Sequence, residues 1–516
     1  MIKNLKISKP ATLLTSLLLV SSMLFTACGA KESANSTTAP STKAAETAAA
    51  AATPAALPEV KLTWYFPGGW PQPDQDQVFA EVNKILKAKI NATVDFKPLS
   101  FGDYDQKMKV IIASGDSYDL NFTSNWLNNY TQNVAKGAYL PLDDLLPKYA
   151  PKAFASVPKT FWDATKVNGK IYGFINQQIS ARTPDVVILK SVADKYNLDL
   201  KALSGKLGPD NLKALEPFLA SVHKEEPQRA FITSLSQYNE AMGYEAIAGF
   251  NVPGVVSYDD SSIKVVNQFE TSAVKSFATL MRDWNAKGYL NSQERISKKT
   301  DDGNDFSKVA LTIGGAFKPG VDVILSNQAK QQVIDVPAGT AHLSTGGIIA
   351  TMHAISRTSK NPERAMMLLE LLNTDKELYN LLNFGFKDKH YKLDADGFKS
   401  PADGSKGYSP GVDWMFATNY LAYVDKGMPV TVWEDTKKVN NDAVPSKLLG
   451  FTFDAEPVKA EIGKTSAVYD EYYRAIDLGV ATEAKYNEFV AKLKDAGSDK
   501  IIAEMQKQID AWKAAK

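Results

Sequence analysis

Strand-like and helix-like stretches alternate from residue 58 to residue 123, and this order limits the chain to few architectures. The apolar residues 60–66 predict an inner strand, and residues 75–89 repeat apolar side chains along one face of an amphipathic helix. Residues 93–96 predict a second strand, another amphipathic helix follows, and residues 118–123 predict a third strand. Alternation of this kind favours an α/β fold in which helices flank a mostly parallel sheet.

Two loops follow predicted strands and are therefore candidates for a binding site, because ligands of open α/β sheets bind beyond the carboxyl ends of the strands. Residues 66–72 carry Trp70, and the next such turn contains Asn125 and Trp126. We expect both loops to line one crevice, where the tryptophans offer flat apolar faces. The alternative is that each tryptophan packs in the core, and flanking asparagines make this less favoured for Trp126.

The chain begins with the pattern of an export leader. Three lysines precede the apolar run 13–25, and Ala27 is the small residue that a cleavage site needs. The run is shorter than the roughly 20 residues of a membrane-spanning helix. Residues 24–28 read Leu-Phe-Thr-Ala-Cys and resemble the bacterial lipobox, which implies a signal peptide at 1–27 and a lipid such as palmitate on Cys28. The alternative is a buried cysteine that happens to follow a leader.

Residues 28–57 predict a disordered tether, because Ala, Ser, Thr and Pro dominate there and large apolar side chains are almost absent. The 59 basic residues lose three lysines with the leader, which leaves a formal charge near −2 against 58 acidic residues. This balance gives no basic excess for binding nucleic acid. Because Cys28 is the only cysteine, the folded part has no disulfide, and we expect packing to stabilise it.

Strand character returns twice later in the chain. Residues 161–178 contain two short apolar strands, residues 183–290 are largely helical, and strand-like runs reappear at 309–313 and 346–354. This pattern predicts that the chain crosses more than once between two lobes. Residues 483–512 predict two further helices that pack against the body.

Three motifs, in order behind the leader and the tether, make the chain similar to the extracellular solute-binding proteins of bacterial ABC importers, in the large group that includes the maltose-binding type. The motifs are Asn168-Gly169-Lys170-Ile171-Tyr172-Gly173, Lys308-Val309-Ala310-Leu311 before a Gly-Gly turn, and Ser359-Lys360-Asn361-Pro362-Glu363-Arg364-Ala365. A closer likeness, to lipoprotein members with a C-terminal domain of unknown function, rests on His390 and its neighbours, on residues 414–419 and on residues 504–508.

The resemblance implies a two-lobed, periplasmic-binding-protein-like α/β fold of type II. Each lobe would be a mostly parallel sheet flanked by helices, with a helical C-terminal extension, and the ligand would lie in the cleft between the lobes. The implied boundaries are 58–175 with 305–345 for lobe one, 180–300 with 350–516 for lobe two, and hinges near 176–182, 305–311 and 348–356.

The family also implies a sugar as the ligand. A sugar has an apolar ring face and a rim of hydroxyls, so its site needs aromatic surfaces beside hydrogen-bonding groups. The polar candidates near the first hinge are equally compatible with simple solvation. The full set of candidate ligand-binding residues is Trp70, Asn125, Trp126, Asn176, Gln178, Arg182, Tyr238, Phe317, Trp414 and Asn419.

Enzymatic interpretations find little support in the sequence. Neighbouring aspartates occur at 74/76, 143/144, 259/260 and 301/302, but adjacent acids in loops are usually solvated, whereas a glycosidase needs two acids across a cleft. The four histidines lack metal-ligand spacing, and neither a Gly-x-Ser-x-Gly elbow nor a phosphate loop occurs. We therefore expect no catalysis, no metal and no cofactor.

The resulting hypothesis is a monomeric receptor, anchored by the lipid on Cys28 to the outer face of the cell membrane. It would capture a small solute, a sugar and more specifically an oligosaccharide, and pass it to ABC transporter permease subunits. No nucleic acid partner is expected. Two alternatives stay open, namely a secreted carbohydrate-active enzyme and a peptide-binding receptor lipoprotein.

Overall fold

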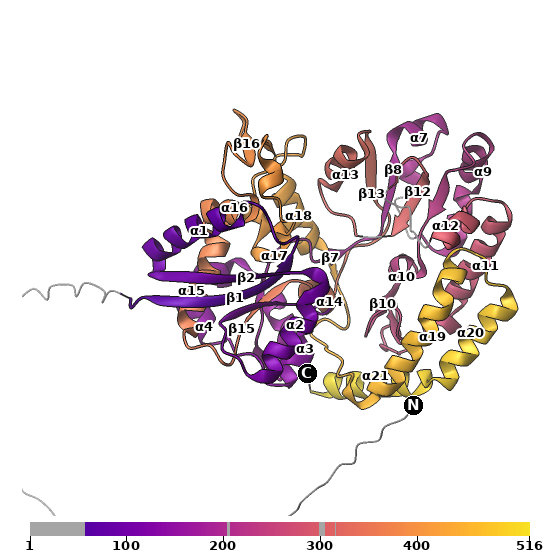
Figure 1. Cartoon of the computed structure of the whole chain (residues 1–516). Helices are drawn as coiled ribbons and strands as arrows, with labels where there is room; N and C mark the ends of the chain where they lie inside the picture. Colours follow the sequence, from indigo (N-terminus) through magenta and orange to yellow (C-terminus); the bar gives the residue numbers. More distant parts are fainter. Residues whose placement is uncertain (1–56, 204–206, 299–304, 315, 516) are drawn as a thin grey trace, which may run out of the picture. The chain divides into compact units, whose positions relative to one another are not determined.

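The computed structural model describes residues 57–203, 207–298, 305–314 and 316–515, and its helices and strands follow in a mixed α/β order (Figure 1). The predicted signal peptide, the predicted lipidation site Cys28 and residues 28–56 of the predicted tether lie outside the described residues.

The first sheet contains five strands in the order β2-β1-β3-β15-β6. These strands are β1 (Val60–Gly68), β2 (Ala92–Ser100), β3 (Leu120–Thr123), β6 (Phe174–Ile175) and β15 (Met352–Ile355). β1 runs parallel to β2 and to β3, which confirms the parallel pairing predicted for residues 58–123. β15 is antiparallel to β3 and β6, because the chain enters it at the edge where β3 ends, with Met352 opposite Thr123.

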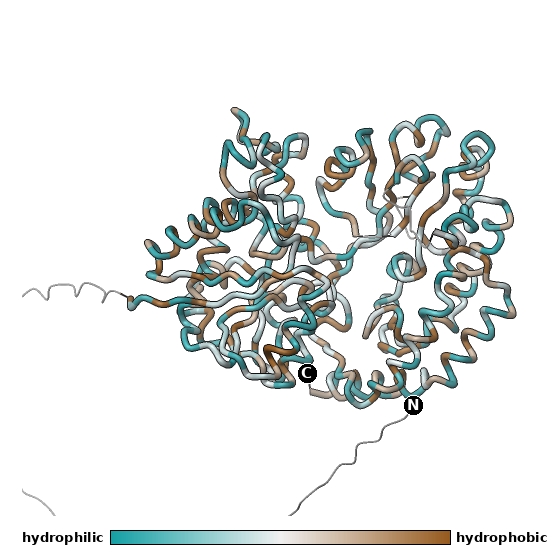
Figure 2. The backbone as a smooth tube through the Cα atoms, in the orientation of Figure 1, coloured by the Kyte–Doolittle hydropathy of each residue, from teal (hydrophilic) through white to brown (hydrophobic). Residues whose placement is uncertain are grey.

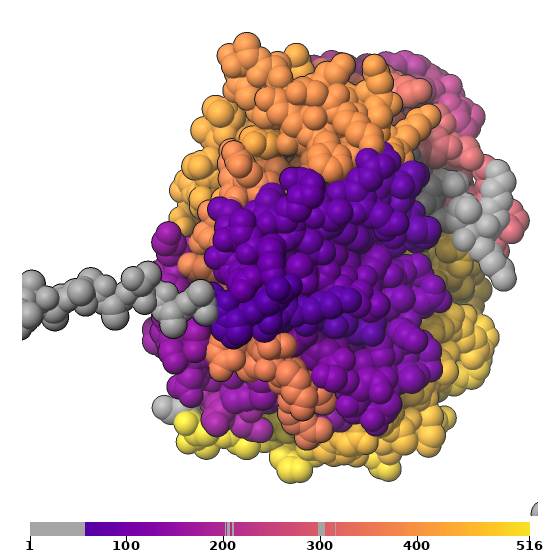
Figure 3. All heavy atoms as spheres, turned by 60° about the vertical axis from the view of Figure 1, so that its left-hand side comes forward, coloured from indigo at the N-terminus to yellow at the C-terminus, as the bar shows by residue number. Residues whose placement is uncertain are grey.

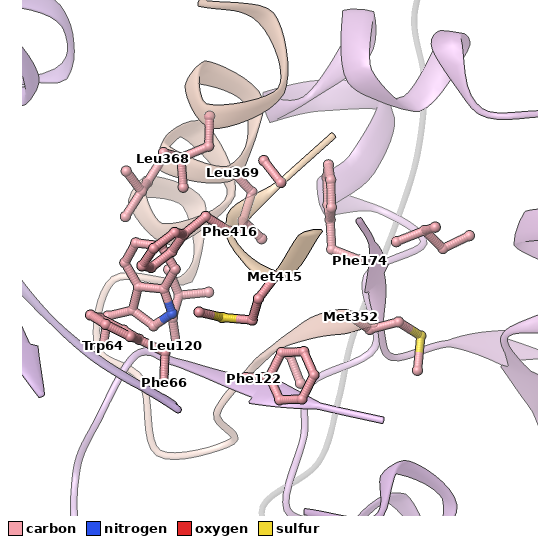
Figure 4. Packing of buried hydrophobic residues seen from close by; sticks show 14 of the residues in the cluster. Trp64, Phe66, Leu120, Phe122, Phe174, Met352, Leu368, Leu369, Met415 and Phe416 are labelled. Carbon is pink, nitrogen blue, oxygen red and sulfur yellow. The ribbon is translucent and has the colours of Figure 1, made fainter. Parts of the chain in front are cut away.

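Apolar side chains from the strands and from later segments form the core over this sheet. Trp64, Phe122 and Met352 belong to three of its strands and share one buried cluster with Met415 and Phe416, as Figure 4 shows. Helices cover the sheet because each turns an apolar stripe toward this core, and α1 (Gln75–Ile90) buries the face that its periodicity predicted. Figure 2 shows the stripes as brown turns alternating with teal ones along the outer helices.

The first lobe is built from two distant parts of the chain. Figure 3 shows this on one face, where orange residues of the later part adjoin the indigo residues of the first elements. Its helices are α1 (Gln75–Ile90), α2 (Phe101–Ser114), α3 (Tyr130–Ala135), α4 (Leu145–Tyr149), α5 (Pro151–Ser156), α6 (Lys159–Ala164), α14 (Thr345–Ile348), α15 (Pro362–Thr374), α16 (Lys376–Phe384), α17 (Asp413–Phe416) and α18 (Val432–Asp442). Two small hairpins join β4 (Lys166–Val167) to β5 (Lys170–Ile171), and β16 (Tyr391–Leu393) to β17 (Lys399–Pro401).

The second sheet contains four strands in the order β13-β8-β12-β9. They are β8 (Asp185–Leu189), β9 (Ala230–Ile232), β12 (Val309–Gly314) and β13 (Val333–Pro337). β12 is parallel to β9 and antiparallel to β8, so this sheet is mixed as well. The other elements of the second lobe are α7 (Lys190–Lys195), α8 (Pro209–Leu212), α9 (Glu216–Glu225), α10 (Leu235–Tyr238), β10 (Tyr244–Ala246), β11 (Val255–Ser257), α11 (Ser272–Ala286), α12 (Ser292–Lys298) and α13 (Val321–Ala329).

The α/β class and the division into two lobes are confirmed, whereas the predicted lobe boundaries are wrong. Residues 305–345 were assigned to lobe one, but β12 and β13 pair with β8 and belong to the second core. Residues 350–443 were assigned to lobe two, but β15 and the helices that follow pack into the first core. The physical reason is that a short apolar run indicates a strand without indicating which sheet supplies its hydrogen-bond partners.

Three short strands carry the chain between the two cores and pair with one another in the order β18-β14-β7. They are β7 (Ala181–Arg182), β14 (His342–Leu343) and β18 (Val444–Pro445), and we call them the hinge sheet. The predicted hinge at 176–182 includes β7. The hinges predicted at 305–311 and 348–356 are wrong, because the first range runs into β12 of the second sheet and the second contains β15 of the first sheet.

The C-terminal region is helical, as predicted, and it completes the second lobe. It contains α19 (Lys459–Asp477), α20 (Glu483–Asp495) and α21 (Ser498–Ala514). α19 and α20 contribute to the second core, and α21 packs in a separate apolar cluster with the β10–β11 region. In the described part of the chain, no helix combines the length and the apolar character needed to cross a bilayer.

One buried cation ties the residues just before β1 and the end of α1 to the later half of the first lobe. The Arg364 side chain on α15 is 6% exposed and donates to the carbonyl oxygens of Pro58, Ile90 and Asn91. Two of these carbonyls end α1, where the helix dipole favours a positive charge.

We predict that Arg364→Met lowers the free energy of unfolding by about 2–4 kcal/mol, because three buried carbonyls lose their donor. Thermal or urea unfolding of the full chain measures this loss. Lys360→Met, which removes an exposed cation just before the same helix, serves as the control. Equal stabilities of the two variants would contradict the role given to Arg364.

Candidate functional site

Three aromatic rings gather where strands of the first sheet end. Phe101 follows β2 directly, Trp126 lies three residues after β3, and Trp414 comes from α17. Phe101 and Trp414 are stacked, with ring centroids 6.3 Å apart and an angle of 18° between the planes. Trp126 lies 6.0 Å from Trp414 and 6.5 Å from Phe101. We call Phe101, Trp126 and Trp414 the aromatic platform.

The platform keeps apolar area open to solvent. The Trp126 side chain is 53% exposed and that of Phe101 is 41% exposed, although large aromatic side chains are usually well buried. Phe122, which is fully buried, supports the platform from below with edge-on and tilted contacts to Trp414 and Trp126 at 6.0 Å. An exposed aromatic face that the core supports in this way is typical of binding surfaces.

Hydrogen bonds hold the Trp126 ring in place. Its backbone N–H and that of Leu127 donate to Ser124 Oγ at 3.2 and 2.8 Å, which closes a tight turn after β3. The indole Nε1 donates to the Ala350 carbonyl at 2.8 Å. Next to it, Asn125 is exposed and its amide donates to the Gly346 carbonyl at 3.2 Å. The indole polar atom is therefore satisfied within the protein, and its exposed apolar face is left for contact with a ligand.

The structure therefore has Trp126 exposed, as predicted. The prediction that Trp70 is an exposed ring in the binding crevice is wrong. Trp70 is 9% exposed and packs against Phe66, Phe79 and Tyr408 at centroid distances of 5.6–6.0 Å. The reason is long-range: the loop after β1 is covered by a later segment, and the Gly69 N–H donates to the Pro410 carbonyl. The sequence interpretation of Trp70 as a core residue was the right alternative.

Three other candidates are also sealed from solvent. Tyr238 is fully buried, is stacked on Phe277 at 5.1 Å and donates its hydroxyl to the Leu207 carbonyl. Asn176 is 1% exposed, and its amide is hydrogen-bonded to the Met415 carbonyl and to His353. Asn419 is 0% exposed. These three side chains are buried in the protein interior, so the prediction that they contact the ligand directly is wrong for this conformation.

The remaining candidates lie at or near the hinge sheet. Gln178 is half-buried, with its amide donating to Thr351 Oγ1 at 3.2 Å. Arg182 is exposed on β7 and its Nε lies 3.4 Å from Glu240 Oε1. Phe317 is half-buried in the second lobe, after β12, and its N–H donates to the Thr183 carbonyl at 2.8 Å. Arg182 and Phe317 are thus the candidates that connect to the second lobe.

Sequence reasoning missed Phe101 as a member of the platform. The predicted strand ended at residue 96, whereas β2 continues to Ser100, so the sequence interpretation did not place Phe101 directly after a strand. The residue also begins α2, whose N-cap is Ser100 with its Oγ accepting from the Asp103 N–H at 3.2 Å.

Several of the paired acids in the sequence have local structural roles. The Asp74 carboxylate accepts from His390 Nε2 at 3.0 Å and lies 3.0 Å from Lys389 Nζ, and both interactions lower its pKa. Asp143 accepts from the Ile171 N–H, and Asp260 caps a turn at Ser262. The pair 301/302 lies outside the described residues. Among the described residues, no group of three or more His, Cys, Asp or Glu side chains is arranged to hold a metal ion.

Two carboxyls at the hinge end of the second sheet are held away from water. Burial raises the pKa of Asp185 to about 7, and burial together with the nearby Asp185 and Asp322 raises the pKa of Asp335 to about 8. Both groups therefore favour the protonated form in the folded protein more than in the unfolded chain.

Two family models match this chain. Residues 72–378 match the model described as bacterial extracellular solute-binding protein, and residues 447–514 match a domain of unknown function, DUF3502. The first match covers more than half of the chain. The chain belongs to the bacterial extracellular solute-binding protein family.

Several proteins similar to this solute-binding protein come from Streptococcus pneumoniae. A carbohydrate ABC transporter substrate-binding protein of serotype 4 is 28% identical over 448 residues, which cover 86% of this chain and 89% of the relative. The crystal structure of the N-glycan transport solute binding protein NgtS is similar, with a TM-score of 0.76 and 25% identity over 88% of this chain and 99% of that one. NgtS in complex with Man1GlcNAc matches with a TM-score of 0.70 and 26% identity, over 88% of this chain and 99% of that one.

The buried Asp335 makes the stability of the protein depend on pH. Its folded pKa is raised above the unfolded value near 4, so the stability it contributes when protonated is lost as pH rises from about 4 through about 8. We predict that Asp335→Asn raises the melting temperature at pH 9 and has little effect at pH 4. Melting scans across this range measure the difference, with the exposed Asp495→Asn as control. A parallel shift at all pH values would contradict the assignment.

Proposed function

We propose that this solute-binding protein binds a sugar, more specifically an oligosaccharide, and delivers it to the permease subunits of an ABC transporter. The observation that carries the proposal is the aromatic platform, which is open at the carboxyl edge of the first sheet. The relatives' names, which include a carbohydrate transporter protein and an N-glycan binder, support the same ligand class.

The platform suits sugar rings for a physical reason. The C–H faces of a pyranose are apolar and flat, and they stack on aromatic faces while the hydroxyls at the rim bind polar groups. The three ring centroids lie 6.0–6.5 Å from one another, so the apolar surface is wider than a single side chain. This width favours a chain of sugar units over a monosaccharide.

Groups around the platform would bind the hydroxyls. Asn125 stands beside Trp126, and Gln178 and Arg182 lie on the passage into the second lobe. Phe317 offers a second apolar contact from the second lobe. A ligand that touches both lobes stabilises the closed form over the open form by its differential affinity for the two. Capture therefore needs no covalent chemistry, and the protein acts as a receptor and not as an enzyme.

The proposal includes anchoring outside the cell. Residues 24–28 resemble a lipobox, so Cys28 would carry lipid and the tether up to residue 57 would link it to the folded part. Two or more acyl chains give stable membrane attachment, at about 0.8 kcal/mol for each buried CH₂. A single copy that meets the permeases at the membrane suffices for delivery, so we propose a monomer.

We predict that Trp126→Ala weakens oligosaccharide binding about tenfold, because the most exposed ring of the platform is lost, and that Trp126→Phe loses less. Isothermal titration with Man1GlcNAc and Man5GlcNAc, together with short peptides, measures this. Ile296→Ala, which removes an exposed apolar side chain from α12 of the second lobe, is the control. Saturable peptide binding that is insensitive to Trp126→Ala, or turnover of the glycans, would favour one of the alternative functions.

We further predict that Cys28→Ala moves the protein from the membrane fraction to the medium or the soluble fraction, because the acyl acceptor is removed. Fractionation and metabolic labelling with a palmitate analogue measure attachment. Lys31→Ala, three residues further along the tether, is the matched control and should remain labelled. Retention of labelled protein in the Cys28→Ala membrane fraction would contradict lipid attachment at this residue.

A further inference from the structure

The β10–β11 hairpin of the second lobe, with its flanking residues, touches two strands of the hinge sheet, β7 and β14, and the residues that follow the third, β18. At β7, Arg182 Nε lies 3.4 Å from Glu240 Oε1, just before the hairpin. At β14, the His342 ring is stacked on Tyr258, just after the hairpin, with centroids 3.6 Å apart and planes 2° apart. We call residues 240–258 the clasp.

The third contact of the clasp is made at the end of β18. Ser446 Oγ is hydrogen-bonded to the Glu245 carboxyl, and Lys447 Nζ donates to the Tyr258 carbonyl at 2.7 Å. Each of the three passages of the chain between the lobes therefore contacts a side chain of the clasp, namely Glu240, Tyr258 or Glu245.

The C-terminal region supports the clasp from the other side. Gly254 has a φ of +139°, and a Cβ at this position would overlap the sulfur of Met505 on α21. The Val265 N–H donates to Gln506 Oε1 at 2.8 Å. Val252 and Val256 share an apolar cluster with Leu448, Phe451, Ile501, Met505 and Ile509. The C-terminal region therefore begins next to the hinge sheet, and its last helix, α21, packs against the β10–β11 hairpin.

We propose that residues 447–514, which match a domain of unknown function, work with the clasp to set the angle of the hinge and hold the two lobes in the arrangement that binds ligand. The predicted effect of the clasp on ligand binding rests on the proposed function. The predicted effect of the clasp on the hinge does not depend on it. The C-terminal region is then a positioning element for the binding site, with no ligand contact of its own.

The size of the hinge strands explains why a clasp is needed. Each is two residues long, so the sheet offers few backbone hydrogen bonds to resist rotation. Side-chain contacts at all three passages restrict that rotation. A protein whose binding-competent arrangement is only partly populated binds ligand with an affinity reduced by that fraction. Loosening the clasp therefore weakens binding without touching the aromatic platform.

The test measures the distance between the lobes directly. In the full chain carrying Cys28→Ser, spin labels at Lys107→Cys on α2 and Lys224→Cys on α9 report it by pulsed electron paramagnetic resonance. Both labelled positions are exposed. The compared variants are Tyr258→Ala, which removes the stacked ring, Tyr258→Phe, which keeps it, and Ser446→Ala, which removes the hydroxyl bonded to Glu245. Melting curves show whether each variant is folded. If Tyr258→Ala is unfolded, Ser446→Ala alone tests the clasp.

Without glycan, we expect a wider distance distribution in Tyr258→Ala and Ser446→Ala than in the parent, and a parent-like distribution in Tyr258→Phe. With Man5GlcNAc, we expect the Kd of the first two to rise about two- to tenfold. Unchanged distances in the folded variants would overturn the clasp. If the parent binds no glycan, the proposed function fails, while the glycan-free distances still decide whether the clasp exists.

Discussion

The pairing of three two-residue strands in the hinge sheet is the constraint on which the rest of the molecule depends. Leu343 on β14 is paired with Ala181 on one side and with Pro445 on the other, so three passages of the chain share one register. Asn440 reinforces this by accepting from the backbone N–H groups of Ser180 and Ala181 at 2.8 and 2.9 Å. Because each lobe is assembled from segments far apart in the sequence, these passages decide which segments reach which core.

The aromatic platform depends on the same passages. The carbonyl that accepts from the Trp126 indole belongs to Ala350, on the stretch that leads from β14 into β15. Trp414 reaches the platform on a segment whose carbonyl at Met415 is bound by Asn176, directly after β6. Backbone groups that adjoin the hinge therefore fix the orientation of the Trp126 ring and the position of the segment that carries Trp414.

The sequence predicts the local features well and the long-range ones poorly. The alternation of residues 58–123 predicted the parallel pairing of β1 with β2 and β3, and the position of Trp126 after a strand predicted its exposure. Trp70 has the same sequence context but is covered by a segment more than 300 residues later, which no local pattern reveals. The lobe boundaries fail for the same reason, because β12 and β15 have similar apolar character and differ only in their partners.

The C-terminal helices illustrate a related point. The periodicity of residues 483–512 predicts α20 and α21, but the packing of α21 on the β10–β11 region is a long-range contact that only the folded chain reveals. The C-terminal region, which the sequence suggests is an extension, is therefore part of the second lobe.

Hydrogen–deuterium exchange of the full chain with and without Man5GlcNAc tests the central claim most directly, because it reports which backbone segments a bound ligand protects. The account predicts slower exchange on ligand addition at residues 101–104, 124–128 and 412–416, which carry the aromatic platform. Binding of the glycan with no protection in these segments, or with protection confined to other surfaces, would contradict it.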